Sequence, residues 1–190
     1  MNVRVCGTLV FLLIVCSFVC VEAVYTLPED IEVEFTVPHY VIVGEPFKIS
    51  ALVENTGDTI ASVTLELEVD GIPVDHIYSL VLQPGEVREV SFSPLVLSLQ
   101  KSYNISINNL APKTTTALLA EGDLDGDGWE NKYELTLGTD PGNSVQVPTK
   151  SMVLNLIVSK VNEYYRVEEN ERPSILEEIM LWVNVYFSKF

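Results

Sequence analysis

The stretch Ser62-Val-Thr-Leu-Glu-Leu-Glu-Val-Asp70 decides the fold of this 190-residue chain, because apolar and polar side chains alternate along it without a break. Its apolar members are Val63, Leu65, Leu67 and Val69. Successive side chains on a strand point to opposite faces, so this alternation predicts a strand with one buried and one wet face, as in antiparallel sheets.

The same period continues on both sides of this strand. Phe47 to Val53 alternates in the same way, and further strands are expected at 31–37, 40–43, 76–82, 87–93 and 102–108. Turn signals separate them, including Asn55-Thr-Gly57-Asp58 and Gln83-Pro84-Gly85-Glu86. About seven short strands joined by such turns predict an immunoglobulin-like antiparallel β-sandwich over residues 31–112.

Several of these strand and turn residues resemble a known family. They are Val53-Glu-Asn55-Thr-Gly57, Val69-Asp70-Gly71, Leu82-Gln-Pro84-Gly85-Glu86, Val90-Ser-Phe92 and Tyr103-Asn-Ile-Ser-Ile107. Together they resemble the cell-adhesion-related domain of bacterial and archaeal surface proteins, called CARDB, over roughly 34–110. The resemblance implies a surface or secreted setting and a role in adhesion or spacing, and it supplies no catalytic residues.

After this domain the composition changes. Residues 113–121, which begin Lys-Thr-Thr-Thr, are expected to be a linker, and residues 121–141 contain seven acidic residues and one lysine. Residues 123–134 match the twelve-residue calcium loop D-x-[DN]-x-[DN]-G-x5-E at every specified position. Asp123, Asp125 and Asp127 take positions 1, 3 and 5, Asn131 takes position 9 and Glu134 takes position 12.

This spacing has a physical reason. A tight loop turns alternate side chains inward, so three carboxylates converge on one hard cation, while Gly128 at position 6 permits the sharp reversal. The backbone carbonyl of Trp129 is expected to add an oxygen, Asn131 would act through a water, and Glu134 would close the shell. The sequence therefore predicts Ca²⁺ as the cofactor. The alternative is a solvated acidic turn.

The residues that follow extend this pattern. With Gly138-Thr139-Asp140-Pro141, the segment 122–142 resembles the thrombospondin type 3-like and dockerin-like calcium repeats of prokaryotic extracellular proteins. Such repeats occur in tandem, and one good copy is present here.

Helical spacing predicts two amphipathic helices within 147–190. Val153, Ile157, Val161 and Tyr164 form one apolar stripe; Ile175, Ile179, Trp182, Val183 and Tyr186 form another after Pro173. They are expected to pack on each other, on the calcium segment or on a partner. The predicted fold class is thus mainly β, an immunoglobulin-like antiparallel β-sandwich followed by a calcium loop and a small C-terminal α-helical region.

The first 23 residues read as an export signal. Arg4 precedes an uncharged, mostly apolar run over 5–21, and Val21-Glu22-Ala23 supplies small residues for cleavage. A retained N-terminal anchor is the rival interpretation. The cysteines Cys6, Cys16 and Cys20 all lie in this segment, so the exported chain would contain no disulfide.

Composition excludes several functions. A formal net charge of -16 excludes electrostatic binding of nucleic acid. Two histidines, His39 and His76, lie far apart in sequence, and no nucleophile, base and orienter form a recognisable set, so we expect no enzyme. Asn104-Ile-Ser106 is a sequon for N-glycosylation, whose use depends on the organism.

The sequence therefore indicates a secreted or cell-surface, calcium-binding adhesion or structural protein, in which Ca²⁺ orders the junction between the sandwich and the helices. One alternative is an accessory module that recognises a glycan or surface protein for a partner enzyme or complex. A second is a subunit of an extracellular filament or surface layer. The expected partners are an extracellular protein or glycan, or further copies of the chain, with membrane contact only through an uncleaved N-terminal segment.

Overall fold

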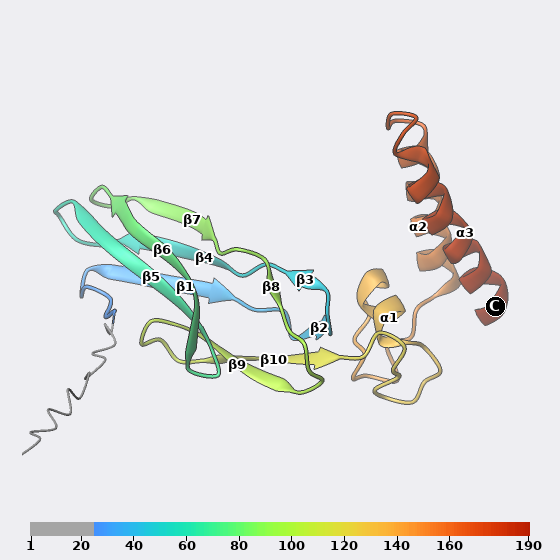
Figure 1. Ribbon diagram of the computed structural model, residues 1–190, viewed down its shortest axis with the longest axis horizontal. Helices are drawn as coiled ribbons and strands as arrows, with labels where there is room; N and C mark the ends of the chain where they lie inside the picture. Colours follow the sequence, from blue (N-terminus) through green and yellow to red (C-terminus); the bar gives the residue numbers. More distant parts are fainter. Residues whose placement is uncertain (1–24) are drawn as a thin grey trace, which may run out of the picture.

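The computed structural model describes residues 25–190, and these residues form a β domain, an acidic loop with a short helix, and a helical hairpin, in that order (Figure 1). The predicted fold class is confirmed, since antiparallel strands dominate and the helices are confined to the C-terminal third. The predicted export segment 1–23 and its cysteines lie outside the described residues. Among residues 25–190, no helix is both long and apolar enough to cross a membrane.

The β domain contains three sheets. The first has three antiparallel strands: β1 (Ile31–Thr36), β4 (Ser50–Asn55) and β7 (Val87–Ser91), in the order β1-β4-β7. The second has five strands: β2 (Tyr40–Ile42), β10 (Lys113–Leu118), β9 (Ser102–Ile107), β5 (Ala61–Val69) and β6 (Ile72–Leu82), in the order β2-β10-β9-β5-β6. A two-stranded sheet pairs β3 (Pro46–Phe47) with β8 (Leu95–Val96).

The core lies between the two larger sheets, and the alternation in β5 predicted which of its side chains enter it. Val63, Leu65, Leu67 and Val69 are all buried in the main hydrophobic cluster. Burial of each such side chain stabilises the fold by about 1.5 to 3 kcal/mol as an upper estimate. The opposite face is wet only in part: Asp70, just after the strand, is exposed, but Glu66 is buried beside His76.

The expected linker over 113–121 is wrong for its first part. Residues 113–118 form β10, which pairs antiparallel with β9 and parallel with β2. Its inward side chains Thr115 and Ala117 are small and fully buried, and its one large apolar residue, Leu118, is buried at its end, so most of the segment lacks the apolar pattern that marks a core strand. Threonine nevertheless favours the extended backbone of a strand.

The two predicted C-terminal helices are present. They are α2 (Lys150–Tyr164) and α3 (Arg172–Lys189), which form a hairpin, and Pro173 lies in the first turn of α3 as expected. A third helix, α1 (Asn131–Leu137), follows the acidic loop. The base of the hairpin packs on this loop through a second hydrophobic cluster of Trp129, Val153, Trp182 and Val185.

Candidate metal centre

The acidic loop connects the end of β10 to α1 and is closed by its own backbone. The carboxylate of Asp123 accepts hydrogen bonds from the N–H groups of Gly126 at 2.7 Å and Gly128 at 2.9 Å. Both glycines have positive φ, 79° and 94° respectively, a region that residues with a Cβ rarely adopt. The position of Gly128 thus agrees with the reversal expected at the sixth place of the loop.

Three of the predicted ligands come together. Asp123, Asp125 and Asp127 each offer a carboxylate oxygen, and these oxygens lie within 4.8 Å of one another. Among residues 25–190 this is the one convergent group of three or more side chains of the types that bind metals. The arrangement therefore has the shape of a site for a divalent cation, and its ligand atoms are all oxygens.

Glu134 supplies the observation that tests whether a cation fits. Its side chain is fully buried in the first turn of α1, and neither carboxylate oxygen has a hydrogen-bond partner. One oxygen each of Asp125 and Asp127 is buried without a partner as well. Buried carboxylates without partners cost several kcal/mol each, in order of magnitude, unless a cation or a donor compensates them. Glu134 itself lies outside the group of three converging carboxylates, so a cation held by the aspartates would compensate all four oxygens only if it also came within reach of Glu134.

The electrostatics of the loop agree with this interpretation. Burial raises the pKa of Glu134 to about 7, and the charges of Asp127, Asp125 and Asp123 add to the shift. Burial and the neighbouring aspartates also raise the pKa of Asp125. The pKa of Asp123 is instead lowered, chiefly by the N–H of Gly128. Without a cation, the carboxylates therefore destabilise one another's charged forms.

The remaining predicted site residues have additional roles. The backbone N–H of Trp129 donates to Oδ1 of Asp127 at 2.8 Å, and the Trp129 ring is buried in the cluster under the hairpin. Asn131 lies outside the group of converging carboxylates: its Oδ1 accepts from the N–H of Leu124 at 3.1 Å, and its Nδ2 donates to the carbonyl of Leu119 at 2.9 Å. Asn131 thus ties the start of the loop to the start of α1.

Sequence reasoning missed Lys189 in the last turn of α3. Its ammonium group donates to the carbonyl of Gly128 and lies 5.1 Å from the centre of the Trp129 ring. Nothing near Lys189 in the sequence indicates this contact, because the two partners are 61 positions apart. The hairpin is therefore fastened to the loop by a polar contact as well as by the cluster.

On its other side the loop region contacts the β domain. The chain after α1 passes so close to β2 that a Cβ on Gly142 would overlap the hydroxyl group of Tyr40. Burial, then the charges of Asp140 and Asp125, raise the pKa of Tyr40. Leu135 and Thr136 of α1 line a pocket together with Tyr40 and other residues of the β domain. The candidate metal centre thus lies between the two parts of the molecule (Figure 1).

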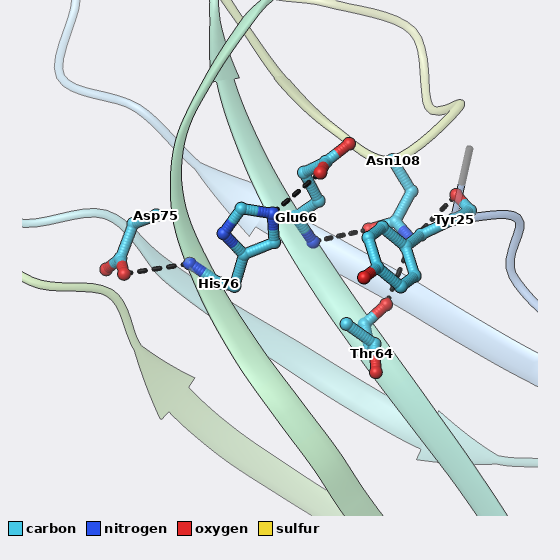
Figure 2. Close-up of polar contacts among 6 residues, drawn as sticks. All are labelled: Tyr25, Thr64, Glu66, Asp75, His76 and Asn108. Atoms are coloured by element: carbon cyan, nitrogen blue, oxygen red, sulfur yellow. Dashed lines mark hydrogen bonds and ion pairs between the residues drawn. The ribbon is translucent and has the colours of Figure 1, made fainter. Parts of the chain in front are cut away.

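A second polar cluster, around His76, is a structural feature of the five-stranded sheet (Figure 2). His76 Nε2 lies 2.7 Å from a carboxylate oxygen of Glu66, and its ring stacks on Tyr78. The Asn108 side chain accepts from the N–H of Glu66 and donates to the carbonyls of Tyr25 and Thr64. No buried polar atom of Glu66, His76 or Asn108 lacks a partner, so this cluster leaves no ligand position open.

No protein-family model matches the sequence, and no curated protein matches it. The chain is similar to the CARDB domain of a Pyrococcus furiosus protein solved with di-metal ions, at 20% identity and a TM-score of 0.43, over 47% of this chain and 94% of that one. It is also similar to a cell-surface protein domain from Methanosarcina acetivorans, at 23% identity and a TM-score of 0.37, over 45% and 87%. A β-glucosidase from Listeria innocua matches at 13% identity and a TM-score of 0.39, over 46% of this chain and 16% of the enzyme. These are likenesses of fold, and they include the family that the sequence resembles.

Proposed function

We propose that the protein binds Ca²⁺ through Asp123, Asp125, Asp127 and Glu134, with the carbonyl of Trp129, and that the ion fixes the helical hairpin to the β domain. The observation that carries the proposal is Glu134, whose two oxygens are buried without partners and whose carboxylate is influenced by the charges of the three converging aspartates. A group of this kind is stable in a folded protein when a cation compensates its charge.

Calcium is the cation that this set of ligands favours. All the candidate ligand atoms are oxygens, which argues against zinc, since zinc sites in proteins are built mainly from cysteine and histidine. Magnesium requires near-octahedral geometry and keeps several of its waters, whereas calcium accepts six to eight oxygens in flexible geometry. Four carboxylates and a backbone carbonyl on one short loop suit calcium better.

The position of the site supports a role in joining the two parts of the molecule. Asp123, Asp125 and Asp127 precede α1, and Trp129, between them and the helix, packs under the hairpin. Tyr40 of the β domain meets the chain that leaves α1. A cation that binds the carboxylates would stabilise the loop and, with it, the contacts of Trp129 with the hairpin and of Tyr40 with the chain after α1. Without the cation, repulsion among the carboxylates would weaken both contacts.

The proposed setting is extracellular, and the proposed role is structural or adhesive. The apolar N-terminal run supports export, and the proposed calcium site suits a calcium-containing environment. An adhesion partner, whether a protein or a glycan, would bind the β domain. Assembly into a larger surface structure is the second candidate, favoured by the exposed hairpin face described below.

Calorimetric titration of the exported chain (residues 24–190) with Ca²⁺, Mg²⁺ and Zn²⁺ tests the site. We expect calcium to bind with a dissociation constant of about 10⁻⁶ to 10⁻³ M, and Glu134→Gln to weaken binding at least ~100-fold, because glutamine offers one uncharged oxygen. Glu121→Gln is the matched control, since Glu121 is an exposed acid of the same segment. The proposal would be refuted if the unmutated chain showed no heat of binding on addition of calcium, or if Glu134→Gln and Glu121→Gln bound calcium with equal affinity.

A further inference from the structure

The helical hairpin has an apolar face that no other part of the described chain covers. On α2 and α3, several residues that directly follow the buried stripe are apolar and exposed. On α2 they are Leu154 and Val158, followed by Tyr165 at its C-cap, and on α3 they are Leu176, Met180 and Phe187, with exposed fractions from 42 to 79%. The hairpin projects away from the β domain, and only its base touches the acidic loop (Figure 1).

These residues lie on one side of the hairpin. Each is one position, and so about 100°, beyond a residue of the stripe that packs between the helices. Because the two helices run in opposite directions and face each other, the same rotation brings both exposed stripes to the same side. Lys160 and Glu178, each one position before a packing residue, confirm the geometry, because they meet across the opposite side at 2.7 Å.

The apolar face, defined by these six residues and Val183, has the properties of a surface that pairs with itself. None of the seven is charged. Asn162 and Asn184 lie at its edge, with the exposed Glu177 two turns before Asn184. On α3 the spacing of Leu176, Met180, Val183 and Phe187 is four, three, four, which is the repeat of a helix that packs along a seam.

The net charge of the chain and the exposed area of the apolar face both favour a second copy of the chain as the partner that covers this face. A chain with a net charge of -16 repels its own copies, so two copies approach most easily through a face without charge. A charge-free face is also compatible with itself across a two-fold axis. The six side chains expose roughly 700 Å² per copy, close to the ~800 Å² that each partner contributes to a standard interface.

We infer that this face binds the same face of a second copy, so that two hairpins form a four-helix bundle and the protein is a dimer. The β domains would then extend from the two ends of the bundle. This inference goes beyond the proposed function, and it does not depend on the identity of the cation.

Sedimentation velocity of the exported chain in calcium-containing buffer tests the inference. The unmutated chain should be a dimer at micromolar concentration, and Met180→Glu should weaken dimerisation at least ~100-fold, because it buries a charge at the centre of the face. The matched control is Leu181→Glu on the opposite side of α3, where the exposed fraction is similar, 46% against 53%. Leu181→Glu should remain a dimer.

Three results would overturn the inference: a monomeric unmutated chain, equal loss of the dimer in both variants, or a monomer that sediments with phosphatidylcholine vesicles, which would show that the face binds a lipid surface.

A milder substitution tests the inference if Met180→Glu does not fold. Residues 25–190 contain no cysteine, so Met180→Cys, at the middle of α3, should form an intermolecular disulfide on oxidation and Leu181→Cys should not. Absence of the Met180→Cys disulfide would also count against the dimer.

Discussion

Asn131 has the residue type expected at the ninth position of a calcium loop, yet its side chain is bonded within the protein on both sides. It accepts from Leu124 and donates to the carbonyl of Leu119, and it is almost completely buried. The donated hydrogen bond distinguishes two roles. A ligand that acts through a water needs an oxygen, which aspartate also has, whereas a tie to a carbonyl needs the amide.

We therefore expect Asn131→Asp to lower the free energy of unfolding in calcium-free buffer by about 1 to 3 kcal/mol. It replaces the amide donor by a carboxylate that faces the Leu119 carbonyl, which keeps only the N–H of Gly122, and it adds a fifth negative charge beside four acidic side chains. Urea unfolding followed by circular dichroism measures the change. Asn143→Asp is the control, since the amide oxygen of Asn143 accepts from Val145 and aspartate retains an acceptor there. Equal stability of Asn131→Asp and the unmutated chain would show that the donated bond contributes nothing.

At the residue scale the sequence named the candidate ligands, of which the structure brings Asp123, Asp125 and Asp127 together, but it did not reveal the bonding inside the site. Regular loop spacing is local information, so all six candidate ligands could be named from residues 123–134. An oxygen of the loop can accept a hydrogen bond from a residue outside it. The loop sequence alone does not predict such bonds. Lys189, whose ammonium group meets the Gly128 carbonyl from the far end of the chain, is the clearest case.

At the scale of elements, β10 is the strand that the sequence pattern did not predict. The first four residues of the strand are polar, and its one large apolar residue, Leu118, comes at its end, so no alternation of apolar and polar residues marks it. Its parallel partner, β2, is more than seventy positions earlier in the chain, and such a pairing leaves no local signal. β5, with strong alternation and one face in the core, was predicted within one residue of its observed bounds, whereas the alternating stretch 47–53 divides between β3 and β4.

Thr115 gives a direct test that β10 belongs to the core. It is fully buried, and its hydroxyl group has no hydrogen-bond partner. Valine has nearly the same shape without the hydroxyl, so Thr115→Val should raise the free energy of unfolding by about 1 kcal/mol. The exposed neighbour Thr114, whose hydroxyl bonds to Asn104, is the control, and Thr114→Val should change stability by less than about 0.5 kcal/mol. Equal effects in denaturant unfolding would argue against the core position of Thr115.

At the scale of the whole molecule, the distribution of charge follows the three parts. Residues 121–141 contain seven acidic residues and one lysine, and they lie between the β domain and the hairpin. The β domain has a large hydrophobic core of its own that does not include the acidic residues. The hairpin, in contrast, packs on the rest of the chain mainly through the cluster around Trp129 and Trp182. The acidic loop is thus the part of the molecule whose order decides how the hairpin is held.

Hydrogen exchange of residues 24–190, compared between calcium-containing and chelator-containing buffer, tests the central claim most directly. Removal of calcium should increase exchange in the loop, in α1 and at the base of the hairpin around Val153 and Val185, while β5 and β9 stay protected. Glu134→Gln in calcium should exchange like the calcium-free chain, and Glu121→Gln like the unmutated one. Exchange that is unchanged by the chelator, or that increases only within the loop, would contradict the claim that calcium joins the hairpin to the β domain.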